Sequence, residues 1–434
     1  MQKEKHGTEE KSSVNARKLA HESLCRIEKN GRYSNIEVDV QLKSSELPGS
    51  ERALYTRLVY GVIEKKITLD HIISGYSSKP VGGLDSDVLN AIRLGIYQLV
   101  FTDRIPEYSA VNESVGLVRK EKRGYVNAIL RSFMRDGKRV TYPEEHIKYL
   151  SVKYSVSEPL VKKLIESLGD SAESYLEASG SREGVDLRIN TILANAGDAL
   201  RITGGKISDI APDVIRVRQL DEKIREGLEK GLWFVQDEAS RIASAVVGAK
   251  PGDTVVDTCS CPGGKSFSMA IDMHNSGVVH SYDIHGNKLT LVQSGAERLK
   301  IDIIRTEKRD AREPDEALFG AADRVLCDAP CSGFGVISKK PEIRYKDVSE
   351  SDRLPDIQLE ILEGASKYVK KKGTLVYSTC TVIKAENEGV VGRFLERNPD
   401  FHIEDSSVIG SGMRMFRPDT DGCDGFFVAK MIRD

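Results

Sequence analysis

Two cysteines follow apolar runs that are typical of buried strands. Cys331 comes three residues after the run Arg324–Asp328, and Cys380 comes two residues after the run Thr374–Ser378. If these runs are parallel strands of one sheet, both thiols lie at its carboxyl rim, where open α/β sheets bind their ligands. A thiolate at that rim could attack as a nucleophile and form a covalent intermediate. Asp328 could donate or accept a proton or a hydrogen bond beside it.

Two other roles compete for the cysteines. A free cysteine is often a small buried residue, and this interpretation suits Cys327 and Cys25. Zinc is the second alternative, because Cys259 and Cys261 lie in the same part of the chain as Cys327 and Cys331. Their spacing contains no C-x₂-C pair and no His partner is nearby, so we expect no metal site. Seven cysteines also form no even disulfide set, which favours a reducing cytoplasm.

A glycine-containing loop follows the apolar run Thr254–Asp257 and is the candidate for binding a cofactor. Paired glycines let the backbone approach a ligand closely, and the helix that follows offers its N-terminal N–H groups. The loop has neither the GxGxxG spacing of a dinucleotide site nor the full GxxxxGK[ST] spacing of a P-loop. Its residues are Cys259, Ser260, Cys261, Pro262, Gly263, Gly264 and Lys265.

Two carboxylates stand at the ends of the next predicted strands. Asp283 closes the run Val278–Asp283, and Asp310 follows the apolar pair Ile303 and Ile304. An acidic residue at the end of a second strand commonly binds a ribose diol in such folds. Together with the glycine loop, the two carboxylates predict a nucleoside pocket, in which Asp310 could meet the adenine edge.

The elements that must position these residues differ along the chain. From about residue 252, short apolar runs alternate with helical patterns, which predicts a parallel α/β sheet, with Phe426–Lys430 as a late strand. Residues 14–140 show apolar positions at helical spacing and predict an all-α domain. Alternation over Leu187–Ile192 predicts a strand in between. We expect four parts: a disordered leader (1–13), a helical domain (14–140), a linking region (141–235) and an α/β domain (236–434).

The charge distribution suggests a nucleic-acid partner only locally. The chain has 434 residues and a formal net charge of −2, but residues 119–139 contain eight Lys and Arg against two Asp and Glu. Such a strip can attract a phosphate backbone, although charge alone slightly favours a solvated helix face. No apolar stretch approaches the roughly 20 residues of a membrane span, and the start lacks a secretory signal. We expect no membrane partner.

Three segments resemble the sequence motifs of a known family. DTCSCPGGKS, VLCDAPCSGFGVI and VYSTCTVIKAENEGVV resemble motifs I, IV and VI of the NOL/NOP/Sun family of RNA 5-methylcytosine methyltransferases. The segments FVQDEAS and DGFFVA are similar to two further stretches of that family. The resemblance covers the chain from about residue 180 to its end. It departs from the usual CAAPGGKT at Cys261, where the family has Ala.

The resemblance implies a role for each candidate residue. S-adenosyl-L-methionine would bind the loop from Cys259 to Lys265, with Asp283 on the ribose, Asp310 near the adenine and Asp328 between cofactor and cytosine. The motif VI cysteine, Cys380, would attack C6 of the base, and the motif IV cysteine, Cys331, would assist product release. Only the family resemblance ranks the two thiols.

The N-terminal part is similar to a NusB-like RNA-binding domain, through AVNESV and YVNAILR. Its fusion to the catalytic part resembles bacterial members of the family that methylate one cytosine of 16S rRNA before the small subunit is assembled. We therefore predict a multidomain protein with an all-α NusB-like domain and a Rossmann-like class I methyltransferase domain. Between them, residues 141–235 are expected to form linker helices and a small RNA-recognition region. The expected substrate is 16S rRNA, naked or in an early assembly intermediate, and the expected state is a monomer. The predicted RNA contacts are Arg119, Lys120, Lys122, Arg123, Arg131, Lys339, Lys340 and Arg344.

Two alternatives stay open from the sequence. The first is an enzyme of the same family that acts on another rRNA or tRNA cytosine. The second is an RNA-binding or antitermination factor that carries an inactive methyltransferase fold. The presence of Cys331, Cys380 and Asp328 argues against the second alternative.

Overall fold

The computed structural model describes residues 15–31, 33–180 and 184–434. The chain divides into two compact units, one of residues 1–161 with 344–346 and the other of residues 162–343 with 347–434. The leader predicted for residues 1–13 lies outside the described residues.

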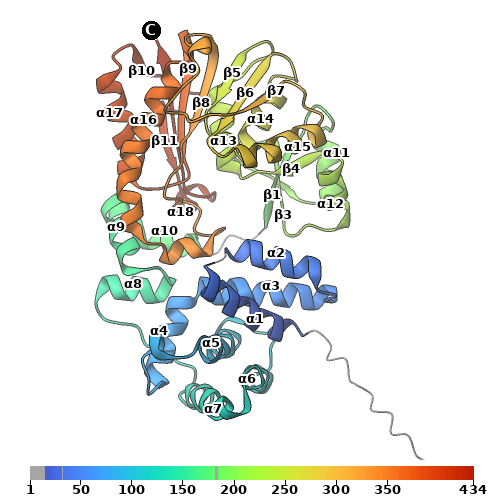
Figure 1. The fold of residues 1–434 in the computed structure, drawn as a ribbon, viewed down its shortest axis with the longest axis vertical. Helices are drawn as coiled ribbons and strands as arrows, with labels where there is room; N and C mark the ends of the chain where they lie inside the picture. The colour runs from blue at the N-terminus through green and yellow to red at the C-terminus, as the bar shows by residue number, and fades with distance from the viewer. Residues whose placement is uncertain (1–14, 32, 181–183) are drawn as a thin grey trace, which may run out of the picture. The chain divides into compact units, whose positions relative to one another are not determined.

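The first unit is helical throughout its described residues (Figure 1). Its central helix is α5 (Ser86–Phe101), in which every residue from Val88 to Leu99 is buried. Gly95 permits this packing, because a Cβ there would lie 2.7 Å from the Leu130 side chain of α7. The other helices are α1 (Ala16–Asn30), α2 (Ser34–Ser44), α3 (Gly49–Glu64), α4 (Lys66–Tyr76), α6 (Glu107–Gly116), α7 (Lys120–Arg135) and α8 (His146–Tyr154).

The second unit begins with a small antiparallel sheet. After α9 (Glu158–Leu168), which starts in the first unit, and α10 (Ala172–Ala178), its strands run in the order β2-β3-β1-β4. Trp233 on β4 anchors the sheet to helix α12, because its Nε1 donates to the Ile224 carbonyl at 2.9 Å. The elements are β1 (Val185–Ile189), α11 (Ala196–Thr203), β2 (Lys206–Ile207), β3 (Val214–Val217), α12 (Glu222–Glu229) and β4 (Trp233–Val235).

An eight-stranded sheet forms the rest of this unit, with the order β10-β12-β9-β8-β5-β6-β7 and β11 paired to β12. Strands β5 to β9 are parallel, and β12 runs antiparallel to β9. The strands are β5 (Thr254–Asp257), β6 (Val278–Asp283), β7 (Ile304–Lys308), β8 (Ala322–Asp328), β9 (Val369–Thr379), β10 (Phe401–Ile403), β11 (Met413–Phe416) and β12 (Phe426–Arg433).

Helices cover both faces of this sheet, which explains why its central strands are continuous apolar runs. One core includes α13 (Glu238–Val247), α14 (Gly264–Asp272) and α15 (Leu289–Leu299), and the other includes α16 (Leu354–Ser366) and α17 (Glu388–Arg397) (Figure 1). The short helix α18 (Pro418–Asp421) precedes β12.

The observed architecture confirms the predicted fold class, an all-α N-terminal part followed by a Rossmann-like sheet. The runs Thr254–Asp257 and Val278–Asp283 are strands with those bounds, while β12 extends beyond the predicted run to Arg433. The strand predicted over Leu187–Ile192 ends earlier, at Ile189. The buried Asn190 side chain stops it by donating to the carbonyls of Gly231 and Leu299 at 3.0 and 2.9 Å.

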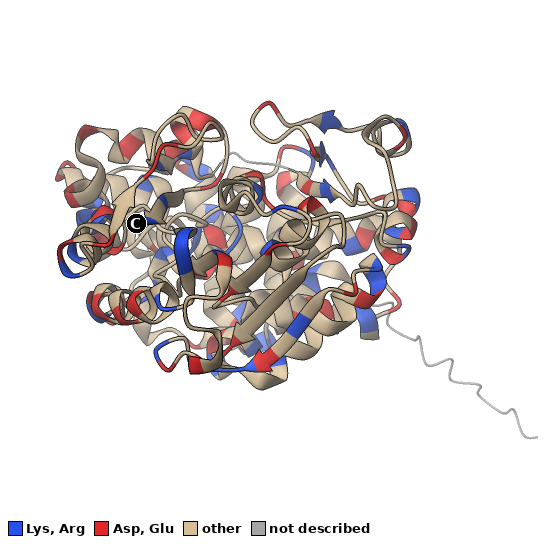
Figure 2. Cartoon of the chain, turned by 90° about the horizontal axis from the view of Figure 1, so that it is seen from above, with Lys and Arg blue, Asp and Glu red and all other residues tan. Residues whose placement is uncertain are grey.

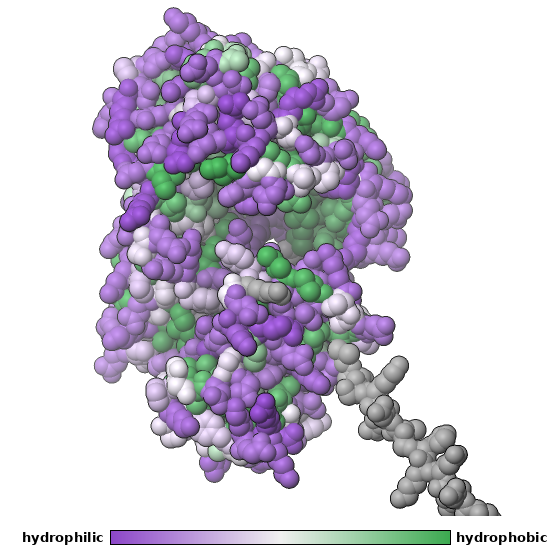
Figure 3. Space-filling model, viewed as in Figure 1, coloured by the Kyte–Doolittle hydropathy of each residue, from purple (hydrophilic) through white to green (hydrophobic). Residues whose placement is uncertain are grey.

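The face of the molecule in Figure 3 is mostly hydrophilic, with apolar atoms in scattered patches. Among the described residues, no helix has the length and apolar character required to cross a bilayer.

Candidate active site

The two candidate cysteines lie in contact. Strands β8 and β9 are parallel neighbours, with Asp328 opposite Ser378, so the loops that follow them leave the sheet side by side. Cys331 Sγ and Cys380 Sγ are 3.1 Å apart. The Cys380 backbone N–H also donates to Cys331 Sγ at 3.2 Å. The structure thus brings together the two thiols that the sequence could only place at one rim.

The surroundings of the two thiols are not equivalent. The contact with Cys331 lowers the pKa of Cys380, and the charges of Lys265 and Lys340 act in the same direction against burial and Asp328. The same thiol–thiol contact, together with burial and the charge of Glu386, holds the pKa of Cys331 well above its usual value. A thiolate is the nucleophilic form of cysteine, so these surroundings favour Cys380 as the nucleophile.

Asp328 lies at the end of β8 and forms an ion pair that crosses the site. Lys265 Nζ donates to its Oδ2 at 2.6 Å, and the Ser378 hydroxyl donates to its Oδ1 at 2.7 Å. Burial lowers the pKa of Lys265, but Asp328 more than offsets this, so the net shift is upward and the ammonium is retained. Lys265 also lies 5.1 Å from the centre of the Phe426 ring. The sequence pattern indicated only that Lys265 belongs to the cofactor loop. In the structure, its charged partner is Asp328, the candidate catalytic carboxylate.

The candidate cofactor loop connects β5 to α14 in a tight path. Gly263 has φ of +111°, and a Cβ there would lie 2.4 Å from the Phe267 ring, so only glycine fits without rearrangement. Its N–H donates to the Ser260 carbonyl at 2.7 Å, while the Ser260 N–H donates to the Tyr282 carbonyl at 2.8 Å. The Cys261–Pro262 peptide bond is cis.

The two carboxylates predicted to bind the nucleoside differ in their hydrogen-bond partners. Asp283 accepts hydrogen bonds from the backbone N–H groups of Cys261 and His285 at 3.3 and 2.8 Å. It therefore stays tied to the loop and retains lone pairs for a diol. Asp310 is held by its neighbour Arg312, whose guanidinium donates to both carboxylate oxygens and keeps the pKa of Asp310 low.

The donor set of the loop fits a nucleoside-bearing cofactor. Among the described residues, Ser260 Oγ and Asp257 Oδ1 are buried without a hydrogen-bond partner. Such orphaned atoms are unusual in native proteins and indicate a missing ligand or water. Burial raises the pKa of Asp257 to about 7, while its other oxygen accepts from the Ser266 hydroxyl at 2.6 Å. S-adenosyl-L-methionine, with its adenosine and amino-acid groups, carries donors for both orphaned atoms.

The remaining cysteines of this region differ in burial, since Cys259 and Cys261 are only partly buried. Cys327 is fully buried in β8, and burial raises its pKa and that of Cys259. Burial, together with Asp283, raises the pKa of Cys261 to about 12. Within the described part of the chain, no group of three or more His, Cys, Asp and Glu residues is placed to hold a metal ion.

Helix α7 carries most of the predicted RNA contacts. Its buried face is Val126, Ile129, Leu130 and Phe133. Arg119, Lys120, Arg123 and Arg131 are exposed, while Lys122 is half-buried and pairs with Asp85 and Asp87 at 2.8 and 3.0 Å. Four of these five predicted contacts therefore remain accessible to a phosphate. The face drawn in Figure 2 shows basic and acidic residues interspersed elsewhere, without one dominant sign.

The three predicted contacts beyond Ser338 have different surroundings. Lys340 is exposed, and its charge acts on Cys380. Lys339 is partly exposed but pairs with Asp237 and Asp424 at 2.5 and 2.8 Å.

Arg344 was predicted to contact RNA, and this prediction is wrong. Its side chain is 2% exposed, its guanidinium donates to the Tyr154 carbonyl at 2.9 Å, and it lies 3.7 Å from Glu64. The segment 344–346 is part of the helical unit, where the Tyr345 hydroxyl donates to the Ile63 carbonyl at 3.2 Å. The burial of Arg344 therefore serves packing of that unit and leaves no surface for a phosphate.

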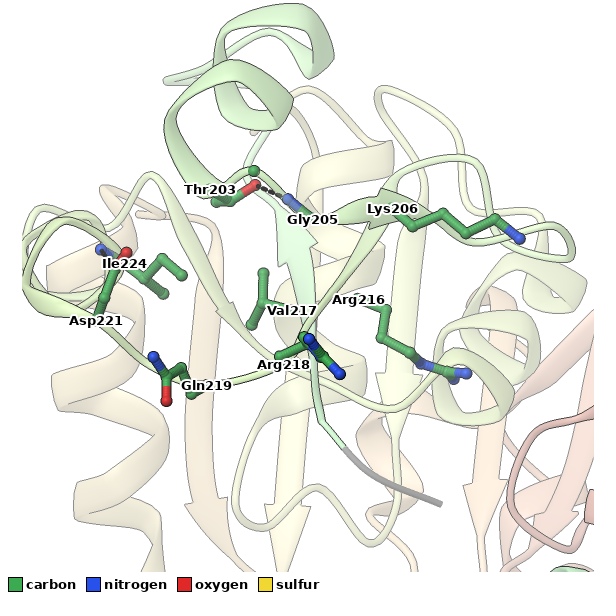
Figure 4. A pocket seen from close by; sticks show the side chains of 10 residues that line it. Thr203, Gly205, Lys206, Arg216, Val217, Arg218, Gln219, Asp221 and Ile224 are labelled. Atoms are coloured by element: carbon green, nitrogen blue, oxygen red, sulfur yellow. Dashed lines mark hydrogen bonds between the residues drawn. The ribbon is translucent and has the colours of Figure 1, made fainter. Parts of the chain in front are cut away.

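The small sheet presents a concave site of about 520 Å³ beside β3 (Figure 4). Arg218 is exposed among its lining residues, and Lys206, also exposed, pairs with Asp209 at 2.8 Å. Arg216 also lines it but pairs with Asp186 and Glu238. The sequence placed RNA recognition in this region without indicating these residues.

The polar residues behind the two cysteines were not recognised from the sequence. Glu386 and Asn387 are buried and hydrogen-bonded to the loops that carry Cys331 and Cys380. Glu386 is a charged residue that is only 1% exposed, although it lies soon after a strand end. The sequence could not indicate this, because burial cannot be read from local residue types.

Family models match both halves of the chain. The model for 16S rRNA methyltransferase RsmB/F matches residues 244–432. The NusB family model matches residues 14–135. The resemblances drawn from the motifs and from the helical part are both confirmed.

Relatives match over nearly the whole length. The "Probable ribosomal RNA small subunit methyltransferase B" of Bacillus subtilis is 35% identical and covers 97% of this chain and 99% of its own. A protein of the same description from Synechocystis is 30% identical, with 96% and 99% covered. Among solved structures, PH0851 is similar with a TM-score of 0.80 and 25% identity over 96% of this chain and 99% of that chain. NSun6 from Pyrococcus horikoshii with SFG shares the fold, with a TM-score of 0.57, 19% identity, and 63% and 97% covered.

Proposed function

Because the chain belongs to the ribosomal RNA small subunit methyltransferase B family, we propose that it methylates C5 of one cytosine in 16S rRNA through a covalent adduct of Cys380. The observation that carries this proposal is the contact of Cys380 with Cys331 at 3.1 Å, next to the Asp328–Lys265 pair. A methyltransferase that needed no covalent step would have no use for two thiols held together at the rim of its sheet.

The reaction needs a nucleophile because C5 of cytosine is itself unreactive. Cys380 Sγ forms a bond to C6. The π electrons of the C5–C6 double bond are displaced, and C5 becomes an enamine-like, nucleophilic carbon that can take a methyl group. S-adenosyl-L-methionine, when bound, would supply that methyl group in electrophilic form and would leave as S-adenosyl-L-homocysteine. A base then removes the C5 proton, the C5–C6 double bond re-forms, and the S–C6 bond breaks with its electrons returning to Cys380. One difficult substitution is thereby divided into easier steps.

The other residues of the site assist these steps. Asp328, in its protonated form, donates a hydrogen bond to N3 and makes C6 more electrophilic as the thiolate adds. Lys265 keeps Asp328 in place by their 2.6 Å ion pair. The thiol of Cys331 hydrogen-bonds the departing sulfur and assists release of the product. Ser260, Asp283 and the backbone of the glycine loop hold the cofactor, with Asp310 toward the adenine.

The RNA must present the target base unstacked, so a loop cytosine costs less than one in a duplex. Exposed cations of α7 and Lys340 contact phosphates and set the register, while the catalytic rim reads the base. The concave site of the small sheet, with Arg218 and Lys206, takes up a neighbouring nucleotide. Lys339 can join them only by giving up its carboxylate partners.

The deciding experiment maps 5-methylcytosine by mass spectrometry in 16S rRNA incubated with the full chain and the cofactor. We expect one modified cytosine, lost with Cys380→Ser and retained with Cys25→Ser, a thiol of the helical unit. Full activity of Cys380→Ser would disprove the nucleophile assignment. Modification of a tRNA or another rRNA cytosine would support the first alternative enzyme, and RNA binding without any methyl transfer would support the non-catalytic factor.

The same assay tests the substrate's state. Naked 16S rRNA and assembled small subunits are compared at equal concentration. We expect methylation of the naked RNA and little of the assembled subunit, because assembly packs the loops that the enzyme must reach.

A further inference from the structure

Glu386 is a buried carboxylate that connects the loops of both cysteines. It closes the short 3₁₀ helix Lys384–Glu386 and is 1% exposed. Its Oε2 accepts from the Ser332 backbone N–H and from Gln358 Nε2, each at 2.9 Å. Its Oε1 accepts from the Ser332 hydroxyl at 2.6 Å and lies 3.4 Å from the Thr381 hydroxyl. A buried carboxylate is tolerated when both oxygens are satisfied in this way.

These bonds hold Cys331 from both of its neighbours. Ser332, the next residue, gives its backbone N–H and its hydroxyl to Glu386. Pro330, the preceding residue, accepts at its carbonyl from the same Gln358 amide, at 3.0 Å. Gln358 comes from α16 and is fully buried. The position of Cys331 is therefore set by a carboxylate and an amide from elsewhere in the fold.

Cys380 is held in a corresponding way. The hydroxyls of Ser332 and Thr381 are 2.8 Å apart, which joins the two loops directly beside Glu386. Asn387 donates to the Thr381 carbonyl at 3.0 Å and accepts from the Thr379 hydroxyl at 2.5 Å. The Tyr377 hydroxyl fixes Glu386 itself by donating to its backbone carbonyl at 2.7 Å.

The charges around the two thiols also differ in sign. Glu386 is the carboxylate that acts on Cys331, whose other ionisable neighbour is Cys380. Cys380 is influenced by two cations, Lys265 and Lys340, and by the carboxylate of Asp328, which is itself paired with Lys265. A negative charge beside one thiol and positive charges beside the other favour the proton on Cys331.

We propose that Glu386 is a positioning residue that holds Cys331 against Cys380 and keeps Cys331 in its thiol form, an inference that rests on Cys380 being the attacking cysteine. In this role Glu386 touches neither RNA nor cofactor. It ensures that the sulfur beside the nucleophile can donate a hydrogen bond, to the thiolate before attack and to the departing sulfur at release.

Two substitutions separate the charge of Glu386 from its reach. Glu386→Gln removes the charge but keeps the length, and its amide can face the hydroxyls of Ser332 and Thr381, which can rotate to accept. Glu386→Asp keeps the charge but is one methylene too short to reach both loops. Glu388→Gln is the matched control, because Glu388 is exposed two residues further along the chain.

The first measurement is alkylation of each cysteine as a function of pH, read by mass spectrometry on the full chain without RNA or cofactor. With Glu386→Gln we expect the Cys331 thiolate, and hence its alkylation at pH 8, to rise about tenfold, the effect of one pKa unit. Glu386→Asp and Glu388→Gln should leave Cys331 alkylation within about twofold of the unchanged protein.

The second measurement is the covalent RNA–protein adduct on denaturing gels after incubation with 16S rRNA and cofactor. Both Glu386 variants should accumulate adduct, because release needs Cys331 in place as a thiol, whereas Glu388→Gln should not. Melting temperature and cofactor affinity, measured in parallel, identify a variant that has lost its fold. If Glu386→Gln unfolds, the positioning role is tested by whether the folded Glu386→Asp variant accumulates the covalent RNA–protein adduct.

Unchanged Cys331 alkylation in the folded Glu386→Gln variant, with no adduct in either folded Glu386 variant, would overturn the proposal. This outcome is distinguishable from failure of the proposed function, because alkylation requires no catalysis. The nucleophile assignment is tested separately by Cys380→Ser.

Discussion

The sulfur atoms of Cys331 and Cys380 lie 3.1 Å apart, and the proposed reaction gives them different roles. Their contact and the charges around them lower the pKa of Cys380 and raise that of Cys331, which is consistent with Cys380 as the proposed nucleophile. The motifs alone could not rank the two cysteines, since both follow strand ends. The ranking implied by the family resemblance stays a prediction, and Cys380→Ser tests it.

Replacing Cys331 with Ala should uncouple attack from release. The thiolate of Cys380 still adds to the base, but the sulfur that assists its departure is gone. We expect a covalent RNA–protein adduct that survives denaturing gels and turnover at least tenfold slower. Cys327→Ala, which removes a fully buried thiol of β8, controls for the removal of a nearby cysteine. A slow enzyme with no adduct would remove the proposed release role.

Asp257 predicts a pH dependence of stability. Burial raises its pKa from 3.8 to about 7 in the folded protein. Between these two values the folded state therefore holds a proton that the unfolded state has lost. The free energy of unfolding should fall by up to about 1.4 kcal/mol per pH unit as the pH rises through this window, and level off above it.

The variant Asp257→Asn removes this contribution. Urea unfolding between pH 4 and pH 8 should give a shallower decline than in the unchanged protein, with the difference confined to the window below about pH 7. Asp302→Asn, an exposed position, serves as the control. Parallel curves for Asp257→Asn and the unchanged protein would show that the carboxyl is not protonated in the folded state.

At the scale of an element, α7 separates packing from binding by its two faces. Val126, Ile129, Leu130 and Phe133 hold it in the helical core, while exposed cations cover its other side and its N-terminal end. Positive side chains in a first helical turn oppose the helix dipole, at a cost of a few tenths of a kcal/mol each. Their presence there fits a surface that meets an anion.

Removing cations from this face should weaken RNA binding in a salt-dependent way. In the double variant Arg123→Ala with Arg131→Ala, the slope of log K against log salt should decrease by about 0.7 for each phosphate that is no longer neutralised. Cofactor affinity should not change. Lys43→Ala, on an exposed part of α2, is the control. An unchanged salt slope would exclude α7 from the RNA interface and leave its cations as a solvated face.

At the scale of the whole molecule, a buried charge network joins the small sheet to the large one within the second unit. Arg188 on β1 and Arg241 on α13 share the carboxylates of Asp213 and Asp272, at 2.8 to 3.1 Å. Arg188 is 1% exposed, and burial together with Arg241 lowers its pKa to about 10. Two guanidiniums this close need both carboxylates, so the network fixes how the small sheet attaches.

Breaking this network should be costly, because the remaining charges stay buried. We expect Asp272→Ala to lower the free energy of unfolding by about 3 to 5 kcal/mol, measured by chemical denaturation. Glu226→Ala removes an exposed partner of Lys230 and should change it by less than about 1 kcal/mol. Equal effects of the two substitutions would mean that water reaches the network and that it does not hold the sheets together.

The sequence by itself determined the parts of this protein that depend on local pattern. Apolar runs predicted β5 and β6 to the residue, because strands of a sheet covered on both faces are rich in apolar residues. The motifs located the cofactor loop and both thiols, since their chemistry depends on residue type and on short spacing. The family followed from these segments.

Only the tertiary structure decided which charged groups remain available. Arg344 is hydrogen-bonded to Tyr154 and paired with Glu64, both far away in the sequence. Lys339 is paired with Asp237 and Asp424. Glu386 gains its role from Ser332 and Gln358, which lie 54 and 28 residues before it. Burial and ion pairing depend on chain segments that meet in space, and no local pattern encodes which segments will meet.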